Sequence, residues 1–181
     1  MSKKKKLLLH ICCAPCSTYV VEKLSKIYDL SGYFYNPNLY PKSEHDKRLQ
    51  EAKKYFKKIG KNFYSESKYD KKEWLDFIKG LEQEPEGGRR CHKCYRFRMQ
   101  KTAQYARQLG FDVFSTTLTI SPYKKAGDIN PIGEDLAQKF KLEFLDEDYK
   151  KQGGFNKSIE MSHQYNLYRQ NYCGCEFSIR E

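Results

Sequence analysis

The sequence predicts an α/β fold, with an open, largely parallel sheet that carries helices on both faces. Short apolar runs alternate along the chain with longer segments in which apolar residues recur at helical spacing. The first run, residues 5–11, holds three consecutive leucines, as expected for a strand that is covered on both sides. Strands and helices that alternate in this way form parallel units joined by crossover helices.

The strands are predicted from short runs rich in apolar, aromatic or β-branched residues. We expect them at residues 5–11, 30–35, 62–65, 111–118 and 142–145. The second run ends in Asn36-Pro37-Asn38, residue types that favour a turn. Cys12 and Cys13 then follow the first strand directly, at its C-terminal end.

Helices are expected between the strands, where periodic apolar residues meet capping and stop signals. Their predicted ranges are residues 17–28, 43–59, 71–81, 95–109, 132–141 and 157–167. Pro15 suits the first turn of the first helix, Ser43 is the expected N-cap of the second, and Gly110 is a stop signal. A polar loop, residues 83–90, is expected to deliver Cys91.

The predicted organisation is a single domain, residues 1–181, in which residues 146–181 fold back as a helical and irregular cap. Such an arrangement of strands and helices is Rossmann-like, or HUP-like. The sequence contains no P-loop and no G-x-G-x-x-G motif, so a bound nucleoside triphosphate has no support in it.

The chain is strongly basic, with 34 Lys and Arg against 23 Asp and Glu and a formal net charge of +11. This excess favours a polyanionic partner, and 15 tyrosines offer faces on which unstacked bases could rest, so RNA or DNA is the expected class. The alternative is that lysine pairs such as Lys53-Lys54 merely solvate helices. No apolar run is long enough for a signal peptide or a membrane span, so we expect a cytoplasmic protein with no membrane partner.

All seven cysteines fall into three short clusters, which indicates sulfur chemistry rather than scattered core thiols. Thiolates at close spacing suit zinc, copper(I) or an iron-sulfur cluster, and paired thiols of low pKa suit disulfide exchange. The odd number of cysteines and the chain length disfavour the disulfide framework of a small secreted protein.

The first cluster, Cys12, Cys13 and Cys16, is predicted between a parallel strand and a helix, where open α/β sheets place their ligands. The positive end of the helix dipole favours thiolates there. Small core residues are the alternative interpretation.

The second cluster, Cys91-His92-Lys93-Cys94, has the spacing of a metal knuckle or of a thioredoxin-like redox pair. Because it follows a glycine-arginine loop rather than a first strand, metal binding is preferred. Zinc and an iron-sulfur cluster, each shared with Cys12 or Cys13, remain open, and a solvent-facing or supporting role for His92 is favoured over ligation.

The third cluster, Cys173-Gly174-Cys175, can close a small strained disulfide. Strained disulfides are labile, so a redox switch is the leading interpretation, ahead of further metal ligands or an inert tail.

Several ordered motifs resemble the epoxyqueuosine reductase QueH family, and the resemblance runs nearly from end to end. The motifs are Leu9-His10-Ile11-Cys12-Cys13-Ala14-Pro15, Tyr35-Asn36-Pro37-Asn38, Arg90-Cys91-His92-Lys93-Cys94-Tyr95-Arg96, Ser115-Thr116-Thr117-Leu118 with Ser121-Pro122, and Tyr168-Arg169-Gln170-Asn171-Tyr172-Cys173-Gly174-Cys175.

The resemblance implies an oxidoreductase that removes the epoxide oxygen of epoxyqueuosine in the tRNA anticodon and leaves queuosine, with two electrons from an external donor. It implies a [4Fe-4S] cluster held by four cysteines and an additional mononuclear iron, of which Cys16 would be a ligand. The four implied cluster ligands are Cys12, Cys13, Cys91 and Cys94. The same resemblance implies that Cys173 and Cys175 form a redox-active disulfide.

One segment departs from the family pattern, since Lys150 stands where an arginine is expected after Asp148-Tyr149. A lysine keeps the charge but lacks the bidentate guanidinium. Candidates for the proton donor to the epoxide oxygen are Asp148, which we take as a catalytic residue, and Tyr123 and His10. The competing hypotheses are a zinc-binding, non-catalytic tRNA-binding module and a thiol oxidoreductase that uses Cys91 and Cys94.

Overall fold

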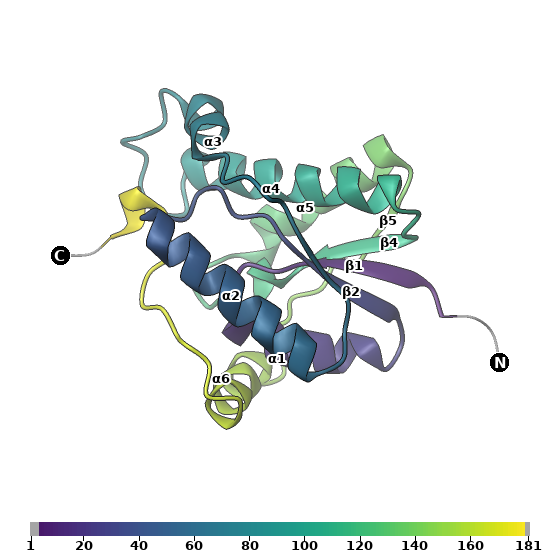
Figure 1. Ribbon diagram of the computed structural model, residues 1–181. Helices are drawn as coiled ribbons and strands as arrows, with labels where there is room; N and C mark the ends of the chain where they lie inside the picture. Colours follow the sequence, from purple (N-terminus) through teal and green to yellow (C-terminus); the bar gives the residue numbers. More distant parts are fainter. Residues whose placement is uncertain (1–3, 180–181) are drawn as a thin grey trace.

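The computed structural model describes residues 4–179, which form one parallel sheet between two layers of helices (Figure 1). Residues 1–3 of the lysine-rich start and residues 180–181 of the expected cap lie outside the described residues. The elements in chain order are β1 Lys6–His10, α1 Ala14–Ser25, β2 Asp29–Phe34, α2 Lys42–Lys58, β3 Phe63–Ser65, α3 Lys71–Ile78, α4 Arg89–Gln108, β4 Val113–Thr116, α5 Ala126–Phe140, β5 Glu143–Phe144 and α6 Gly154–Gln164. Two short 3-10 turns, Thr117–Ile120 and Glu176–Ser178, complete them.

In residues 4–179 the sheet has five strands, in the order β3-β2-β1-β4-β5, and every neighbouring pair is parallel. In the centre, Leu8 of β1 pairs with Ser31 of β2 on one side and with Phe114 of β4 on the other. The predicted α/β class is confirmed, and the sheet is wholly parallel rather than largely so.

Both faces of the sheet are covered, as predicted: α1, α2 and α6 lie on one face, and α4 and α5 lie on the other (Figure 1). Successive leucines of β1 point to opposite faces because side chains alternate along a strand. Leu7 and Leu9 pack in the first core with Phe56 of α2, whereas Leu8 packs in the second with Met99 of α4. Because both faces of β1 are buried, its sequence is a continuous run of apolar residues.

Helix α4 begins at Arg89, not near Tyr95 as the sequence predicts. Gly87 has a positive φ of 86° and ends the preceding loop, and the extended Gly88 takes the N-cap position. The helix therefore starts before the second cysteine cluster. Cys91 and Cys94 lie on its first turns, and the expected delivery of Cys91 by a loop is wrong.

Other helices and strands also begin or end at residues other than those predicted, because local caps and turns fix their ends. Strand β4 ends at Thr116, whose side chain accepts a hydrogen bond from the Leu118 amide and caps the 3-10 turn that follows. Helix α2 starts at Lys42 with Pro41 at its N-cap, so Ser43 lies inside the first turn and is not the cap. Helix α5 starts at Ala126, earlier than predicted.

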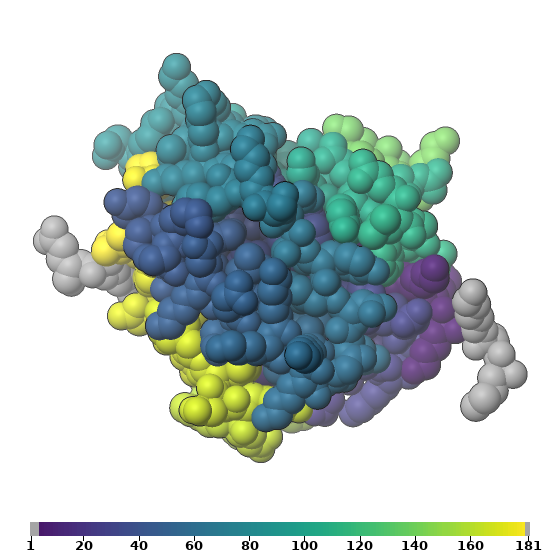
Figure 2. Space-filling model, viewed as in Figure 1, coloured from purple at the N-terminus to yellow at the C-terminus, as the bar shows by residue number. Residues whose placement is uncertain are grey.

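The segment from residue 146 onward folds back across α1 and then follows α2 to the carboxyl ends of the strands, as the yellow-green ribbon of Figure 1 shows. The Thr18 hydroxyl donates to the Ser158 carbonyl at 3.4 Å, and the rings of Tyr55 and Tyr165 meet edge to face at 5.1 Å. In the space-filling view of Figure 2, this segment lies beside the blue surface of α2. The C-terminal cysteines thereby reach the edge of the sheet at which β1 ends.

Among the described helices, none has the combination of length and apolar character that a bilayer crossing requires.

Gly32 in β2 offers a test of core packing, because a Cβ there would lie 2.6 Å from the buried ring of Phe56. We expect Gly32→Ala to lower the free energy of unfolding by about 1–3 kcal/mol through overpacking. Gly127→Ala in α5 is the control, since a Cβ there meets nothing within 4 Å. Urea unfolding of both variants measures the difference, and equal stability of the two would contradict the packing described.

His45 on α2 gives a test of stability against pH. Burial lowers its pKa from the ordinary value of 6.5, although the hydrogen bond to Asp46 opposes the shift; the charge of Lys42 lowers it further. The unfolded chain therefore binds a proton more readily than the folded one as the pH falls through about 6.5. We expect the stability of the protein to fall between pH 7.5 and 5, and to fall less steeply in His45→Gln. Parallel unfolding curves for the two proteins would refute this.

Candidate metal and redox centre

The first cysteine cluster lies at the point where the sheet reverses its order, beside the carboxyl ends of β1 and β4. After β1 the chain enters α1 on one face, and after β4 it enters α5 on the other, which is where parallel sheets open a ligand site. The two ends are linked, because the Cys12 amide donates to the Thr117 hydroxyl oxygen at 3.1 Å. The Thr117 hydroxyl also lies 3.3 Å from Cys12 Sγ.

Cys12, Cys13 and Cys16 form a compact group in which all three Sγ atoms lie within 4.8 Å of one another. Cys13 is the N-cap of α1 and Cys16 lies in its first turn, with Pro15 between them in the first turn as predicted. The Cys12 and Cys13 sulfurs are 3.8 Å apart. Such a set of converging sulfurs has the donor chemistry of a thiophilic metal centre.

The thiols of this group have pKa values that are shifted in different directions. Hydrogen bonds from Cys13 and Cys16 hold the pKa of Cys12 well below its usual range, and the charge of Arg98 acts in the same direction. The same bond to Cys12, together with burial, raises the pKa of Cys13 to about 12. Within this group the pKa of Cys12 is thus lowered and that of Cys13 is raised.

The two cysteines of α4 are not part of this compact group within residues 4–179. The Gly87 amide donates to Cys91 Sγ at 3.2 Å, and Arg98 approaches Cys94 Sγ at 4.0 Å. Burial raises the pKa of Cys91, and it raises that of Cys94 to about 11. Of the four cluster ligands that the sequence indicates, the structure thus brings Cys12 and Cys13 together with Cys16.

Cys173 and Cys175 are both free thiols in the structure, so the predicted disulfide between them is not formed. Gly174 has a φ of 121°, and a Cβ there would lie 2.9 Å from the Arg48 guanidinium as well as against Leu39. The Tyr40 amide donates to the Gly174 carbonyl at 2.7 Å, and Arg48 donates to the Cys173 carbonyl at 3.1 Å. The middle residue of this cluster must therefore be glycine, and its backbone is fixed against α2.

A cavity of about 330 Å³ opens beside these thiols. Its wall includes three sulfurs, four basic side chains, two side-chain amides and one carboxylate, that of Glu86, together with apolar and aromatic groups. The sulfurs are those of Cys12, Cys16 and Cys173, and the basic groups are those of Arg48, Arg98, Lys124 and Arg169. This is a small, cationic, sulfur-lined site.

The family model of epoxyqueuosine reductase QueH matches residues 7–181 of the chain. The chain belongs to the epoxyqueuosine reductase QueH family. The predicted resemblance is thereby confirmed, and so is the expected enzyme class, an oxidoreductase. The QueH of Streptococcus pyogenes serotype M1 is 41% identical over 99% of this chain and 72% of its own length. The QueH of Thermotoga maritima is 36% identical over 97% of this chain and 91% of its own length.

The solved structure of the U34-tRNA thiolase NcsA from Methanococcus maripaludis, described with its [4Fe-4S] cluster, is similar in fold. The TM-score is 0.61 at 13% identity, and the match covers 99% of this chain and 63% of the NcsA chain. At this identity the similarity supports the α/β fold and nothing further.

In this QueH family chain, the structure adds residues to the site that the sequence analysis did not single out. Gln170 donates to Cys13 Sγ at 3.0 Å, and Arg48 and Arg98 are buried beside the thiols. Gln170 and Thr117 lie inside the recognised family motifs, and Arg98 follows Cys94 by one helical turn. Nothing in the sequence identifies Arg48 as a site residue, because its position is typical of a basic residue on an amphipathic helix.

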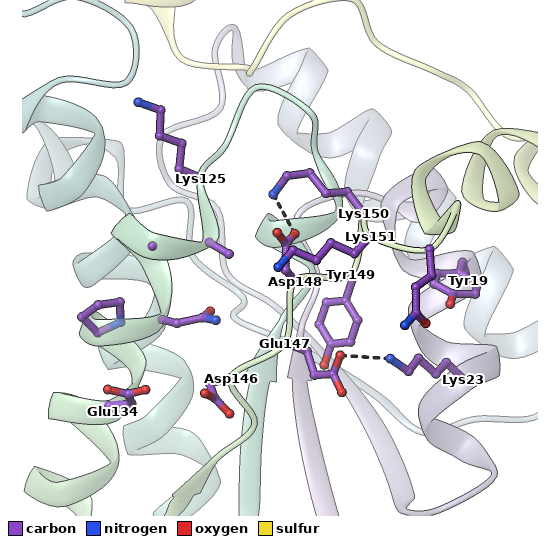
Figure 3. A pocket seen from close by; sticks show the side chains of 15 residues that line it. Tyr19, Lys23, Lys125, Glu134, Asp146, Glu147, Asp148, Tyr149, Lys150 and Lys151 are labelled. Atoms are coloured by element: carbon purple, nitrogen blue, oxygen red, sulfur yellow. Dashed lines mark hydrogen bonds and ion pairs between the residues drawn. The ribbon is translucent and has the colours of Figure 1, made fainter.

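Asp148, the predicted catalytic acid, lines a different and larger cavity of about 820 Å³ between α1, α5 and the loop after β5 (Figure 3). It forms a salt bridge of 2.6 Å with Lys150, and Lys23 similarly pairs with Glu147 at 3.0 Å. Lys150 also donates to the Lys124 carbonyl, so one loop separates the two cavities. Asp148 is not among the residues that line the thiol cavity, and its catalytic role stays a prediction.

The other candidates for the proton donor differ in position. Tyr123 is 74% exposed and lines the thiol cavity. His10 is fully buried, with Nδ1 3.0 Å from the Thr116 hydroxyl and Nε2 3.3 Å from the Tyr35 carbonyl. Burial and the charge of Arg98 lower its pKa to about 3. A neutral imidazole without access to solvent fits a structural link between strands.

The predicted solvent-facing or supporting role of His92 stays a prediction. Its Nε2 is 3.5 Å from Asp128 Oδ2 of α5, and the side chain is about half exposed.

The backbone at Gly174 provides a test of how the terminal thiols are held. We expect Gly174→Ala to lower the free energy of unfolding more than Gly80→Ala, and to speed hydrogen exchange at the Tyr40 amide. Both glycines have a positive φ, but a Cβ at Gly80 meets nothing within 4 Å, so Gly80→Ala carries only the backbone penalty of about 1–2 kcal/mol. Unchanged exchange at Tyr40 would show that this contact does not hold the cluster.

Proposed function

We propose that this chain reduces the epoxide of epoxyqueuosine in tRNA to give queuosine, by two-electron reduction at an iron-sulfur site. Membership of the QueH family supports the reaction class. The observation that carries the proposal is the group of three sulfurs within 4.8 Å of one another, which opens on a cavity also lined by Cys173. A sulfur centre and a separate thiol thus meet at one place where a substrate could enter.

Oxidation of the Cys173 and Cys175 thiols to a disulfide releases as many electrons as the reduction of the epoxide consumes. Removing an epoxide oxygen breaks two carbon-oxygen bonds and forms an alkene and water, which consumes two electrons and two protons. Oxidation of Cys173 and Cys175 from two thiols to one disulfide releases two electrons and two protons. An external electron donor must then reduce the disulfide before the next turnover.

The donor set fits a sulfur-bound metal centre. Within our proposal, Cys12, Cys13, Cys91 and Cys94 hold a [4Fe-4S] cluster, and Cys16 is a ligand of an additional iron. The fit rests on the three sulfurs that lie within 4.8 Å of one another, and on the buried arginines Arg48 and Arg98 beside them. When bound, the cluster would supply single electrons and the adjacent iron a Lewis acid for the epoxide oxygen.

The side chains of the cavity suit a modified base in a single-stranded loop. Tyr172, Tyr123 and Phe155 line the cavity and offer surfaces on which a base can stack. Arg169 and Lys124 lie in the same wall and could hold phosphate or polar groups of the nucleotide. The net charge of +11 is consistent with tRNA as the partner.

Cysteine variants separate the ligands from the redox pair. After anaerobic reconstitution, we expect Cys12→Ser to lose most of its iron and labile sulfide, because one of the three converging sulfurs is removed. Cys173→Ser and Cys175→Ser should keep the visible absorption of the cluster but lose at least about 100-fold in the rate of epoxyqueuosine reduction in tRNA, as expected for loss of a group that takes part in the chemistry. Iron, sulfide and product are measured on the same samples.

The competing zinc module predicts a different result. Anaerobically purified protein would then contain zinc and no labile sulfide, and Cys12→Ser would lose zinc. Retained activity in Cys12→Ser would instead favour a thiol oxidoreductase, and full activity in Cys173→Ser would reduce the C-terminal pair to a structural role. Each of these outcomes contradicts a different part of the proposed function: the identity of the metal centre, the role of Cys12 or the role of Cys173.

A further inference from the structure

Arg98 carries a buried positive charge. The side chain is only 2% exposed and projects from α4 one turn after Cys94. Its Nη2 donates to Asn36 Oδ1 at 2.5 Å, and its Nη1 lies 4.0 Å from Cys94 Sγ. Among the described residues, its Nε has no hydrogen-bond partner. Within residues 4–179, no salt bridge joins this guanidinium to an acidic side chain.

Arg48 lies in the same cavity wall, but its buried positive charge is paired with a carboxylate. It is equally buried, but its Nε donates to Glu44 Oε1 at 2.6 Å. A buried charge without such a partner is strongly unfavourable, so Arg98 requires negative charge from another source.

Arg98 lies among sulfurs. Its Nη1 is 4.0 Å from Cys94 Sγ, and it lines the thiol cavity together with Cys12 and Cys173. These cysteines come from α4, from the loop after β1 and from the C-terminal segment. The guanidinium is therefore placed among all three cysteine clusters.

Asn36 fixes Arg98 in that position. The Asn36 amide group donates to the Ile11 carbonyl at 2.8 Å while its oxygen accepts from Arg98. Ile11 directly precedes Cys12, so a chain of two hydrogen bonds joins Arg98 to the loop that carries the first cluster. The charge is held by the fold itself and does not depend on a flexible surface side chain.

We propose that Arg98 is the fixed counter-charge of the sulfur-bound centre and raises its reduction potential. A positive charge held in a region of low dielectric stabilises the more negative, reduced form, and so makes electron uptake from the donor easier. Arg98 is a positioning residue that acts through the centre and need not touch the substrate. The inference rests on the proposed function, because it requires a redox-active centre at these cysteines.

The test measures the reduction potential of anaerobically reconstituted protein, by titration with dithionite and redox mediators under spectroscopic observation. We expect Arg98→Gln to shift the one-electron equilibrium at least about tenfold toward the oxidised form, which is about 59 mV to lower potential. Arg98→Lys, which keeps the charge, should recover most of the shift. Arg107→Gln, on the exposed far end of α4, is the matched control and should leave the potential unchanged.

A second variant leaves Arg98 in place. Asn36→Asp puts a carboxylate beside the guanidinium, so it should lower the potential in the same direction as Arg98→Gln. Loading of the cluster in Arg98→Lys but not in Arg98→Gln would also support the counter-charge. Equal potentials in the loaded wild type, Arg98→Gln and Asn36→Asp would overturn the inference alone. A wild type that takes up no redox-active cluster would overturn the proposed function and this inference together.

Discussion

The parallel pairing of β1 with β4 is the constraint on which the site depends. These two strands are neighbours in the sheet, yet the chain leaves them toward opposite faces, so the segments that follow their carboxyl ends diverge. The hydrogen bond from the Cys12 amide to Thr117 joins these two segments where they begin. Without this pairing, the Cys12 loop, the turn after β4 and the first turns of α4 would have no common place to meet.

The surroundings of the sulfurs follow from that position. Helix α4 brings two cysteines and Arg98 from one face, and α2 brings Arg48, which fixes the C-terminal segment through the Cys173 carbonyl. Backbone and side-chain donors, among them Gly87 and Gln170, point at individual sulfurs. Buried sulfur that carries negative charge needs such donors and cations, because the interior otherwise favours the neutral thiol. The site is therefore cationic by necessity, in addition to any attraction for a polyanionic substrate.

Local physical signals explain what could be predicted from the sequence. The continuous apolar run of β1, the alternation with amphipathic helices and Gly110 after α4 depend on neighbours in the chain, and all were recognised correctly. Predicted boundaries were wrong where the backbone conformation of a turn or a helix cap decided them. The polar stretch before Cys91 reads as a loop, but two glycines end that loop early and let α4 begin at Arg89.

The sequence by itself determined the fold class, the family and the three cysteine clusters, because periodicity and ordered motifs are properties of the chain. Only the tertiary structure decided which sulfurs converge, that Asp148 lies in a cavity apart from the thiols, and that His10 is a buried link between strands. It also decided that, among residues 4–179, Arg48 forms a salt bridge with a carboxylate whereas Arg98 forms none. Pairing of charges between α4, α2 and the strand ends depends on distances between segments far apart in the chain, and no local pattern encodes those distances.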